Sequence, residues 1–196
     1  MNDVLLVVDV LDDFAHEHGQ ELLSSFARRH TQLVALLSAV REEQTPVVYA
    51  NDNRGTWDAD ADRIIRTAVN GPGGTIVSRV LPRTGERFVI KPRYSAFDHT
   101  PLELILGELD CERLLLAGMT TEGCVAQTAI AAREHGLKVS VAASACATTD
   151  PRKEETALRY LVDVVGVELD DTIRIRGFTA VDSGYLLATN EQGSGE

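Results

Sequence analysis

The sequence predicts an α/β fold, a three-layer αβα arrangement in which helices cover both faces of a mostly parallel, Rossmann-like sheet. Short apolar runs alternate along the chain with longer segments of helical periodicity, which is typical of parallel strands joined by helical crossovers. The first run, Val4–Val8, is apolar at every position, as expected for a strand buried on both faces. A chain of 196 residues is long enough for one domain with a substantial core.

The first half of the chain supplies two strands and two helices. Residues 21–43 carry apolar side chains at helical spacing, and Pro46 then ends the pattern. Val47–Ala50 is predicted to be the second strand, and a short helix is expected over Ala59–Val69. The run Asn-Gly-Pro-Gly-Gly at 70–74 indicates a loop.

The second half continues the alternation. Further strands are predicted at Phe88–Ile90, Arg113–Ala117 and Lys138–Ala142, and helices at 101–109, 123–135 and 151–165. Thr100 is expected to cap the first of these helices with Pro101 at its first position, Gly136 to end the second, and Asp150 to cap the third. We expect one domain over residues 1–189 and a disordered tail over 190–196.

Composition and charge exclude several classes of partner. With 19 Lys and Arg against 30 Asp and Glu, the formal net charge is −11, the wrong sign for coating nucleic acid or an anionic membrane. No apolar run is long enough to span a bilayer, and the N-terminus lacks the basic segment of a signal peptide. Three cysteines without a C-x-x-C pair predict neither a disulfide framework nor a zinc site. We therefore expect a cytoplasmic protein that binds a small molecule, with no nucleic-acid or membrane partner.

Reactive side chains follow three of the predicted strands. Asp9 ends the first strand, Lys91 follows the strand at 88–90, and Cys124 lies just after the strand at 113–117. Because function in open α/β sheets gathers at the carboxyl ends of the strands, these side chains are expected to meet at one edge. Each alone has a plain structural explanation, since free cysteines are commonly small buried hydrophobes and aspartates commonly form turns. The functional interpretation therefore depends on their co-location.

Together the three side chains suit covalent hydrolysis. A helix N-terminus and Lys91 both favour the thiolate of Cys124 over its thiol, and Asp9 can serve first as general base and then as general acid. A thiolate that attacks an sp² carbon gives a covalent intermediate that water clears. Backbone N–H groups in the turn before the helix supply an oxyanion hole. The expected products are an acid and an amine or ammonia.

Four segments resemble the isochorismatase-like cysteine hydrolase superfamily. They are residues 5–14 with Asp9, residues 49–57, residues 89–97 with Lys91, and residues 116–125 with Cys124. The order and spacing of the last two make the resemblance specific, and it extends from about residue 4 to residue 150. It implies a six-stranded parallel sheet and a homo-oligomer, either a dimer or a tetramer.

The resemblance also implies a role for each reactive residue. Asp9 corresponds to the acid and base, Lys91 to the activator and Cys124 to the nucleophile. The family has a cis peptide a few residues before its nucleophile, which corresponds here to the bond between Met119 and Thr120. The oxyanion hole is then formed by the N–H groups of Thr120 and Cys124.

One departure from the family concerns metal binding. Nicotinamidases in this superfamily share an Asp-x-His metal motif after the second strand, with a further histidine later. Here Asp52 is followed by Asn53 and Arg54, and the five histidines do not supply the spacing. His16 and His18 lie in a loop, where solvent exposure is the plainer interpretation. We therefore predict no metal and no cofactor, and we predict that the chain is not a nicotinamidase.

Loop residues near the three reactive side chains are candidates for binding the substrate. They are Phe14, Asn51, Asn53, Arg54, Trp57, Tyr94 and Phe97. Arg54 and Trp57 stand out because their loop is otherwise polar, whereas core packing is the alternative for Phe14 and Phe97. The two asparagines are suited to orienting a substrate amide or carboxylate.

The sequence thus predicts a metal-independent cysteine amidohydrolase that acts on a small non-peptide C–N bond in an amide, ureide or carbamoyl group, through a thioester-type intermediate. Retention of Cys124 favours this reaction over cleavage of a vinyl ether, which needs no thiol. Two alternatives stay open. One is an isochorismatase-type ether hydrolase, which requires more basic residues in the pocket than Arg54 and Arg93. The other is a non-catalytic relative that binds a small molecule.

Overall fold

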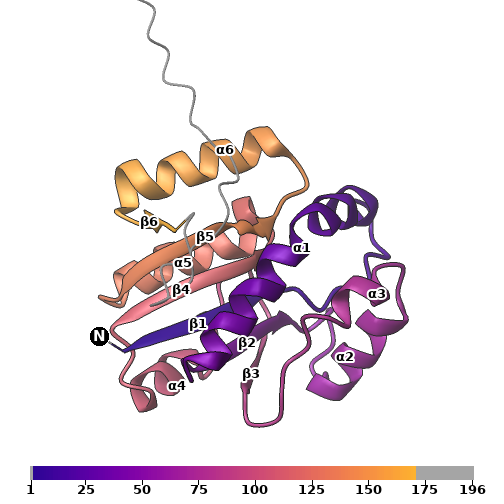
Figure 1. Cartoon of the computed structure of the whole chain (residues 1–196), viewed down its shortest axis with the longest axis horizontal. Helices are drawn as coiled ribbons and strands as arrows, with labels where there is room; N and C mark the ends of the chain where they lie inside the picture. Colours follow the sequence, from indigo (N-terminus) through magenta and orange to yellow (C-terminus); the bar gives the residue numbers. More distant parts are fainter. Residues whose placement is uncertain (1, 171–196) are drawn as a thin grey trace, which may run out of the picture.

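The computed structural model describes residues 2–170, and its strands form a single sheet (Figure 1). The strands are β1 (Asp3–Val8), β2 (Val47–Asp52), β3 (Arg87–Lys91), β4 (Arg113–Met119), β5 (Lys138–Ala147) and β6 (Glu168–Leu169). Their order in the sheet is β3-β2-β1-β4-β5-β6, and every neighbouring pair is parallel. The predicted α/β class and the six-stranded parallel sheet are confirmed.

Helices connect consecutive strands. The α-helices are α1 (Gly19–Glu42), α2 (Ala61–Asn70), α3 (Gly74–Val77), α4 (Leu102–Glu108), α5 (Ala126–Glu134) and α6 (Pro151–Tyr160). Two wider turns of π-helix, η1 (Thr121–Val125) and η2 (Leu161–Val165), precede α5 and continue α6. In Figure 1, α1 crosses one face of the sheet and α5 lies behind the other, which gives the three layers.

β1 is buried on both faces, which accounts for its unbroken apolar sequence. Leu5 and Val7 belong to one hydrophobic core, formed with residues of α1, α2 and α3. Val4, Leu6 and Val8 belong to a second core, formed with residues of α4, α5 and α6. All five side chains are 0% exposed. Successive strand residues point to opposite faces, so only a fully apolar run satisfies both cores.

Helix ends differ from the predictions in detail. The helix after β4 begins at Thr121, ahead of the predicted residue 123, because η1 precedes α5. The predicted cap of α4 was wrong: Pro101, and not Thr100, is its N-cap, and α4 has no capping hydrogen bond from that residue's side chain. Thr100 lies one residue earlier, where its Oγ1 accepts a 3.2 Å hydrogen bond from the N–H of Leu102. Asp150 caps α6 as predicted, by accepting from the N–H of Arg152.

The C-terminal boundary of the predicted domain and the predicted tail at 190–196 lie outside the described residues. Between residues 2 and 170, no helix combines the length and apolarity needed to cross a membrane.

The strand order reverses direction at the centre of the sheet. From β1 the chain adds β2 and β3 on one side, and then returns to add β4, β5 and β6 on the other. In such sheets the crevice at the carboxyl ends of the two strands flanking the reversal is the usual binding position. Those strands are β1 and β4, which directly precede Asp9 and the turn that holds Cys124.

Candidate active site

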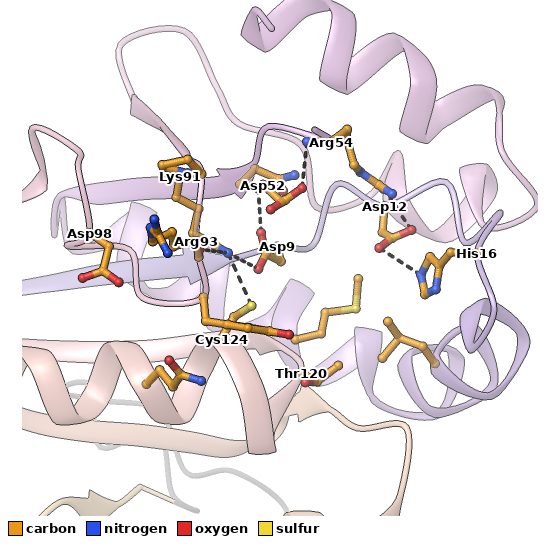
Figure 2. Close-up of a pocket in the computed structure, with 16 residues that line it drawn as sticks. Asp9, Asp12, His16, Asp52, Arg54, Lys91, Arg93, Asp98, Thr120 and Cys124 are labelled. Atoms are coloured by element: carbon orange, nitrogen blue, oxygen red, sulfur yellow. Dashed lines mark hydrogen bonds and ion pairs between the residues drawn. The ribbon is translucent and has the colours of Figure 1, made fainter. Parts of the chain in front are cut away.

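The ends of three parallel strands bring Asp9, Lys91 and Cys124 together (Figure 2). Asp9 directly follows β1, Lys91 is the last residue of β3, and Cys124 lies in η1 after β4. Parallel strands share one carboxyl edge, so three side chains far apart in the sequence meet there, as predicted. Lys91 contacts both of the others.

The ammonium of Lys91 is held by three acceptors. Its Nζ lies 2.7 Å from Oδ2 of Asp9, and it donates hydrogen bonds to Sγ of Cys124 at 3.3 Å and to the backbone oxygen of Arg93 at 3.0 Å. An ammonium has three N–H donors, so each donor has one partner. The Lys91 side chain is only 1% exposed, and a buried ammonium is stable only with such compensation.

The carboxylate of Asp9 is fixed by β2 as well as by the lysine. The N–H of Asp9 donates to the backbone oxygen of Ala50 at 2.8 Å, and its Oδ1 accepts from the N–H of Asp52 at 2.7 Å. Asp9 has a φ of +52°, in the left-handed region that aspartate tolerates better than most residues. The backbone therefore turns sharply at the end of β1 and directs the carboxylate toward Lys91.

Burial dominates the acid–base properties of the lysine and the aspartate. It raises the pKa of the Asp9 carboxyl above its ordinary value, and the charge of Lys91 opposes this only in part. Burial alone would lower the pKa of Lys91, but the neighbouring charge of Asp9 and the sulfur of Cys124 leave that pKa raised. Lys91 therefore stays a cation, and Asp9 is a stronger base than a surface aspartate.

The thiol of Cys124 corrects one expectation from the sequence. Burial, followed by the negative charge of Asp9, raises its pKa to about 12, and Lys91 lowers it by less. The predicted lowering of the thiol pKa was wrong because burial, together with the charge of Asp9, outweighs the attraction of Lys91. Cys124 is therefore a protonated thiol beside a carboxylate.

The turn that leads from β4 to Cys124 begins with a close approach between β4 and β1. Gly118 has a φ of +131°, and a Cβ at this position would lie 2.0 Å from the backbone oxygen of Val8. Only glycine fits such an approach. Shortly after this glycine, the peptide bond between Met119 and Thr120 is cis. Thr120 and Cys124 both line the cavity described below.

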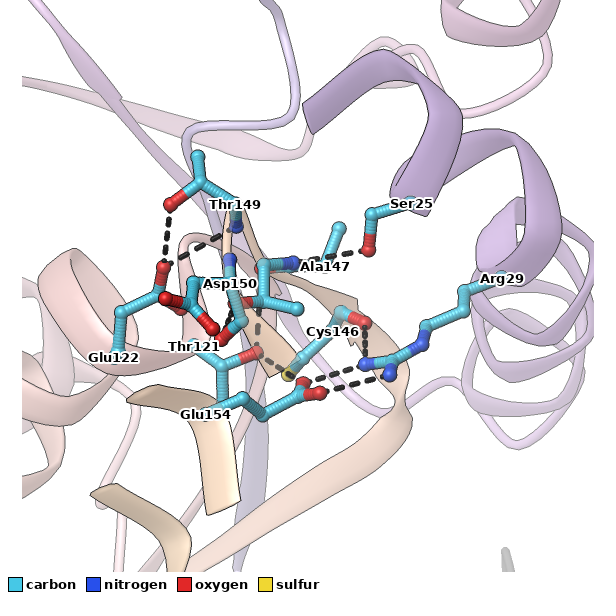
Figure 3. A network of polar contacts seen from close by, with 10 residues as sticks. Ser25, Arg29, Thr121, Glu122, Cys146, Ala147, Thr149, Asp150 and Glu154 are labelled. Carbon is cyan, nitrogen blue, oxygen red and sulfur yellow. Dashed lines mark hydrogen bonds and ion pairs between the residues drawn. The ribbon is translucent and has the colours of Figure 1, made fainter. Parts of the chain in front are cut away.

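A partly buried ion pair between Arg29 and Glu154 supports the same turn (Figure 3). Glu154 of α6 is 2% exposed and accepts hydrogen bonds from both terminal nitrogens of Arg29 in α1, with a distance of 2.8 Å at Oε2. Its Oε1 also accepts a 2.8 Å hydrogen bond from the hydroxyl of Thr121, the first residue of η1. Arg29 donates as well to the backbone oxygen of Cys146. Elements on both faces of the sheet thus hold the turn that carries Cys124.

A cavity of about 630 Å³ opens onto the three reactive side chains, a volume in the usual range for small-molecule sites. It is lined by Asp9, Asp12, His16, Leu22, Asn51, Asp52, Arg54, Lys91, Pro92, Arg93, Tyr94, Asp98, Met119, Thr120, Cys124 and Gln127. Figure 2 shows Arg54, Asp12 and His16 on one side of Asp9, and Arg93 and Asp98 on the other.

Comparison with known proteins identifies the family of this fold and site. Residues 3–171 match the family model of the isochorismatase domain. The chain belongs to the isochorismatase family. This membership supports a hydrolase activity for the protein.

Relatives and solved structures of the isochorismatase family resemble most of the chain. The isochorismatase family protein YaaI of Bacillus subtilis (strain 168) is 27% identical over 165 residues, which cover 84% of this chain and 91% of YaaI. The maleamate amidohydrolase of Pseudomonas putida is 27% identical over 146 residues, covering 70% and 68%. The crystal structure of the nicotinamidase/pyrazinamidase PncA from Bacillus subtilis has a TM-score of 0.69 at 29% identity, covering 86% of this chain and 99% of PncA.

Three of the predicted substrate-binding residues line the cavity of this isochorismatase-family protein. Tyr94 is 63% exposed, so its ring is available to a ligand. Arg54 forms ion pairs with Asp12 and Asp13. The buried amide of Asn51 accepts from the N–H of Leu11 at 3.1 Å and donates to its backbone oxygen at 3.3 Å, so it holds the loop after β1.

The other four predicted residues, Phe14, Asn53, Trp57 and Phe97, lie outside the lining of this cavity. Phe14 is 5% exposed within the core beside α1, and Phe97 stacks on His135 with 4.7 Å between ring centroids. Asn53 is buried and accepts from the N–H of Gly55 within its own loop. Trp57 is 89% exposed. Apolar burial accounts for the first two placements, and the composition of a loop does not reveal which way its side chains point.

Several lining residues were not predicted to bind substrate. Arg93 follows Lys91 by two positions, and Gln127 follows Cys124 by three. Residues three apart in a helix share a face, so the position of Gln127 was accessible from the sequence once Cys124 had been placed. Asp98, in contrast, carries no local pattern that indicates a cavity.

The two histidines considered as metal ligands have different surroundings. Nε2 of His16 lies 3.4 Å from Oδ2 of Asp12, whereas His18 is exposed at the start of α1 and makes no capping hydrogen bond with its side chain. Over residues 2–170, no group of three or more His, Cys, Asp or Glu side chains gathers in a way that could hold a metal ion.

Proposed function

We propose that this protein is a cysteine amidohydrolase that cleaves a small non-peptide C–N bond, in an amide, ureide or carbamoyl group, without a metal. One observation carries the proposal: a single buried ammonium, Lys91, contacts both the carboxylate of Asp9 and the sulfur of Cys124. The names of two relatives, a maleamate amidohydrolase and a nicotinamidase, support amide chemistry in this family.

The first half of the reaction acylates the enzyme. Asp9 removes the proton from the thiol of Cys124 as Sγ attacks the carbonyl carbon of the substrate. The S–C bond forms, the carbonyl π electrons move to oxygen, and a tetrahedral intermediate results. When the carbonyl is restored, the C–N bond breaks and Asp9 returns its proton to the departing nitrogen. Ammonia or an amine leaves, and a thioester remains on Cys124.

The second half regenerates the thiol. A water molecule takes the place of the departed amine, Asp9 removes its proton, and the resulting hydroxide attacks the thioester carbon. The C–S bond breaks, sulfur recovers the proton through Asp9, and the acid product is released. Lys91 keeps its charge throughout and stabilises whichever of its two neighbours is negative. This constant positive charge supplies the stabilisation for which other hydrolases use a metal ion.

The developing oxyanion needs donors in the same cavity. We assign this role to the backbone N–H groups of Thr120 and Cys124, because both residues line the cavity at the nucleophile turn. Such donors contribute about 2.7–4 kcal/mol to transition-state stabilisation in other hydrolases.

Two observations weigh against the alternative functions. A vinyl-ether hydrolase acting on a dianion needs several available cations, but Arg54 is already paired with Asp12 and Asp13. A non-catalytic binding protein has no need of the contacts that join Lys91 to the carboxylate and the sulfur. The homo-oligomeric state and the cytoplasmic location remain predictions, and light scattering on the purified chain tests the first.

The test is ammonia release from a panel of linear amides, ureides and carbamoyl amines. Cys124→Ser and Cys124→Ala are expected to reduce kcat by at least about 10³-fold, while Cys111→Ser, which changes a thiol outside the cavity, is the matched control. Undiminished turnover in either Cys124 variant would refute the covalent mechanism. Loss of activity after dialysis against EDTA, restored by a divalent metal, would refute metal independence.

A further inference from the structure

Two of the cations that line the cavity are already neutralised by the protein. Arg54 lies 3.0 Å from Asp12 and 3.4 Å from Asp13. Lys91 lies 2.7 Å from Asp9. Neither cation has charge to spare for an anionic substrate, because a paired guanidinium or ammonium must first give up its own carboxylate.

Arg93 is different, because its guanidinium has no ion-pair partner among residues 2–170. It is exposed and lines the cavity, and no carboxylate of residues 2–170 lies within ion-pair distance of its guanidinium. Its backbone oxygen accepts the 3.0 Å hydrogen bond from Nζ of Lys91, which fixes its main chain beside the reactive groups. Figure 2 shows its side chain on the side of Lys91 away from Arg54. A planar guanidinium offers two parallel N–H donors, which match the two oxygens of a carboxylate.

Gln127 adds a second polar group to the same cavity from another element. It is exposed in α5, three residues after Cys124 along the chain. Its amide has both donors and an acceptor. It can therefore contact either the NH₂ group or the carbonyl oxygen of a substrate amide near the nucleophile.

We propose that the substrate carries one carboxylate besides the scissile C–N bond, and that Arg93 binds this carboxylate while the scissile carbon faces Sγ of Cys124. This inference rests on the proposed function and deepens it by naming the substrate class, a monoanionic amide or ureide. One unpaired guanidinium suits one carboxylate. A chain with a net charge of −11 repels anions at long range, so an anionic substrate requires a local cation of this kind.

Asp98 supplies an opposing charge at the same end of the cavity. It lines the cavity, is exposed, and lies on the same side as Arg93 in Figure 2. Its carboxylate repels an incoming substrate carboxylate. The variant Asp98→Asn is therefore expected to lower KM for a carboxylate-bearing substrate, opposite to the effect of losing the guanidinium.

The first arm of the test compares matched substrates. Malonamate, succinamate and glutaramate are assayed for ammonia release beside their methyl esters, which have the same length and no charge. For the best-fitting length, kcat/KM is expected to be about 10- to 100-fold higher for the carboxylate than for the ester, the usual effect of a charge-assisted hydrogen-bonded pair. Arg93→Gln is expected to bring this ratio close to one, and Arg93→Lys to an intermediate value. Arg159→Gln, the same charge loss at an exposed site on α6, is expected to keep the ratio.

The second arm needs no turnover. Iodoacetate and iodoacetamide alkylate the same thiolate, so the ratio of their rates at Cys124, measured at one pH by peptide mass spectrometry, is independent of the fraction ionised. The ratio of iodoacetate to iodoacetamide is expected to be about 10-fold higher in the wild-type protein than in Arg93→Gln. The Arg159→Gln control is expected to match the wild type.

The two arms separate the inference from the function on which it rests. Hydrolysis without a preference for the carboxylate would overturn the substrate class and leave the amidohydrolase standing. No hydrolysis in this series or in the panel of amides, ureides and carbamoyl amines, with an alkylation ratio that depends on Arg93, would overturn the function and uphold the anion site. An alkylation ratio unchanged by Arg93→Gln would overturn the inference whatever the hydrolysis shows.

Discussion

Replacing Asp9 by asparagine is expected to move two properties of the site in opposite directions. The thiol of Cys124 becomes more acidic, because the substitution removes the negative charge that competes for Lys91. Turnover is lost, because no group remains to take the thiol proton and return it to the leaving nitrogen. The substituted amide still offers an oxygen to the N–H of Asp52, and asparagine tolerates the left-handed backbone. The backbone of the site is therefore expected to be kept, although the buried ammonium of Lys91 loses its carboxylate and the variant is expected to be less stable by about 3–5 kcal/mol.

The size of the pKa change follows from two distances. Nζ of Lys91 lies 2.7 Å from Oδ2 of Asp9 and 3.3 Å from Sγ of Cys124. The oxygen and the sulfur are thus at most about 6 Å apart, where two negative charges repel by about 2.8 kcal/mol at an effective dielectric constant of about 20. That energy corresponds to a change of about 2 in pKa. The pKa of Cys124, about 12 in the wild-type protein, is expected to fall to about 10.

The assay is the pH dependence of alkylation by iodoacetamide, followed for each cysteine by peptide mass spectrometry. At pH 8 the rate at Cys124 is expected to rise about 100-fold in Asp9→Asn, because the rate follows the fraction of thiolate. Cys111 and Cys146 are internal references, and Asp52→Asn removes a cavity carboxylate that does not contact the ammonium. An unchanged or slower reaction at Cys124 in Asp9→Asn would show that the charge of Asp9 does not raise the thiol pKa.

Three further predictions concern stability. Gly118→Ala places a Cβ 2.0 Å from the backbone oxygen of Val8 and is expected to cost at least about 3 kcal/mol in urea unfolding; an unchanged midpoint would contradict the close approach. Glu154→Gln removes the charge that pairs with Arg29 and is expected to lower the free energy of unfolding by about 3 kcal/mol. It is also expected to lower kcat more than it changes KM. An unchanged free energy of unfolding would show that the pair contributes nothing. The thiol pKa of Cys124 rises on folding from 9.0 to about 12, so the folded state holds a proton that the unfolded state loses. The contribution of this proton to the free energy of unfolding is complete below pH 9 and is lost as the pH rises toward 12. Cys124→Ala is expected to flatten this decline of stability at alkaline pH.

The parts of the fold that the sequence predicts are those with long buried elements. β1 was predicted because burial on both faces leaves only apolar residues, and helix α1 because its buried stripe repeats over 24 residues. Two short elements left no such trace. β6 has only Glu168 and Leu169, and α3 has four residues that follow directly on a glycine-rich loop. These short elements depend on packing against neighbouring elements, and a local sequence pattern does not show such contacts.

Some features of the site could likewise be predicted from the sequence, and others could not. The meeting of Asp9, Lys91 and Cys124 was predictable because the topology of parallel strands carries their ends to one edge. The direction of the thiol pKa was not, because it depends first on how deeply the thiol is buried and then on the charges of Asp9 and Lys91. Sequence reasoning counted the attraction of Lys91, whereas the structure adds burial and the repulsion of Asp9. The position of Trp57 outside the cavity was not predictable either. The sequence shows that Trp57 lies in a loop, but not which way its side chain points.

A thiol pKa of about 12 is compatible with catalysis because the reaction does not require a free thiolate. Burial raises the pKa of both Asp9 and Cys124, and so it opposes any loss of a proton from the site to solvent. Transfer of the proton from sulfur to the carboxylate is different, because the net charge around Lys91 stays the same before and after. The cost of that transfer is set by the difference between the two pKa values, and burial acts on both in the same direction. The Asp9→Asn variant separates the two cases, since it makes the thiolate easier to form yet leaves no base to receive and return the proton. Faster alkylation together with lost hydrolysis is therefore the result that an internal proton transfer requires.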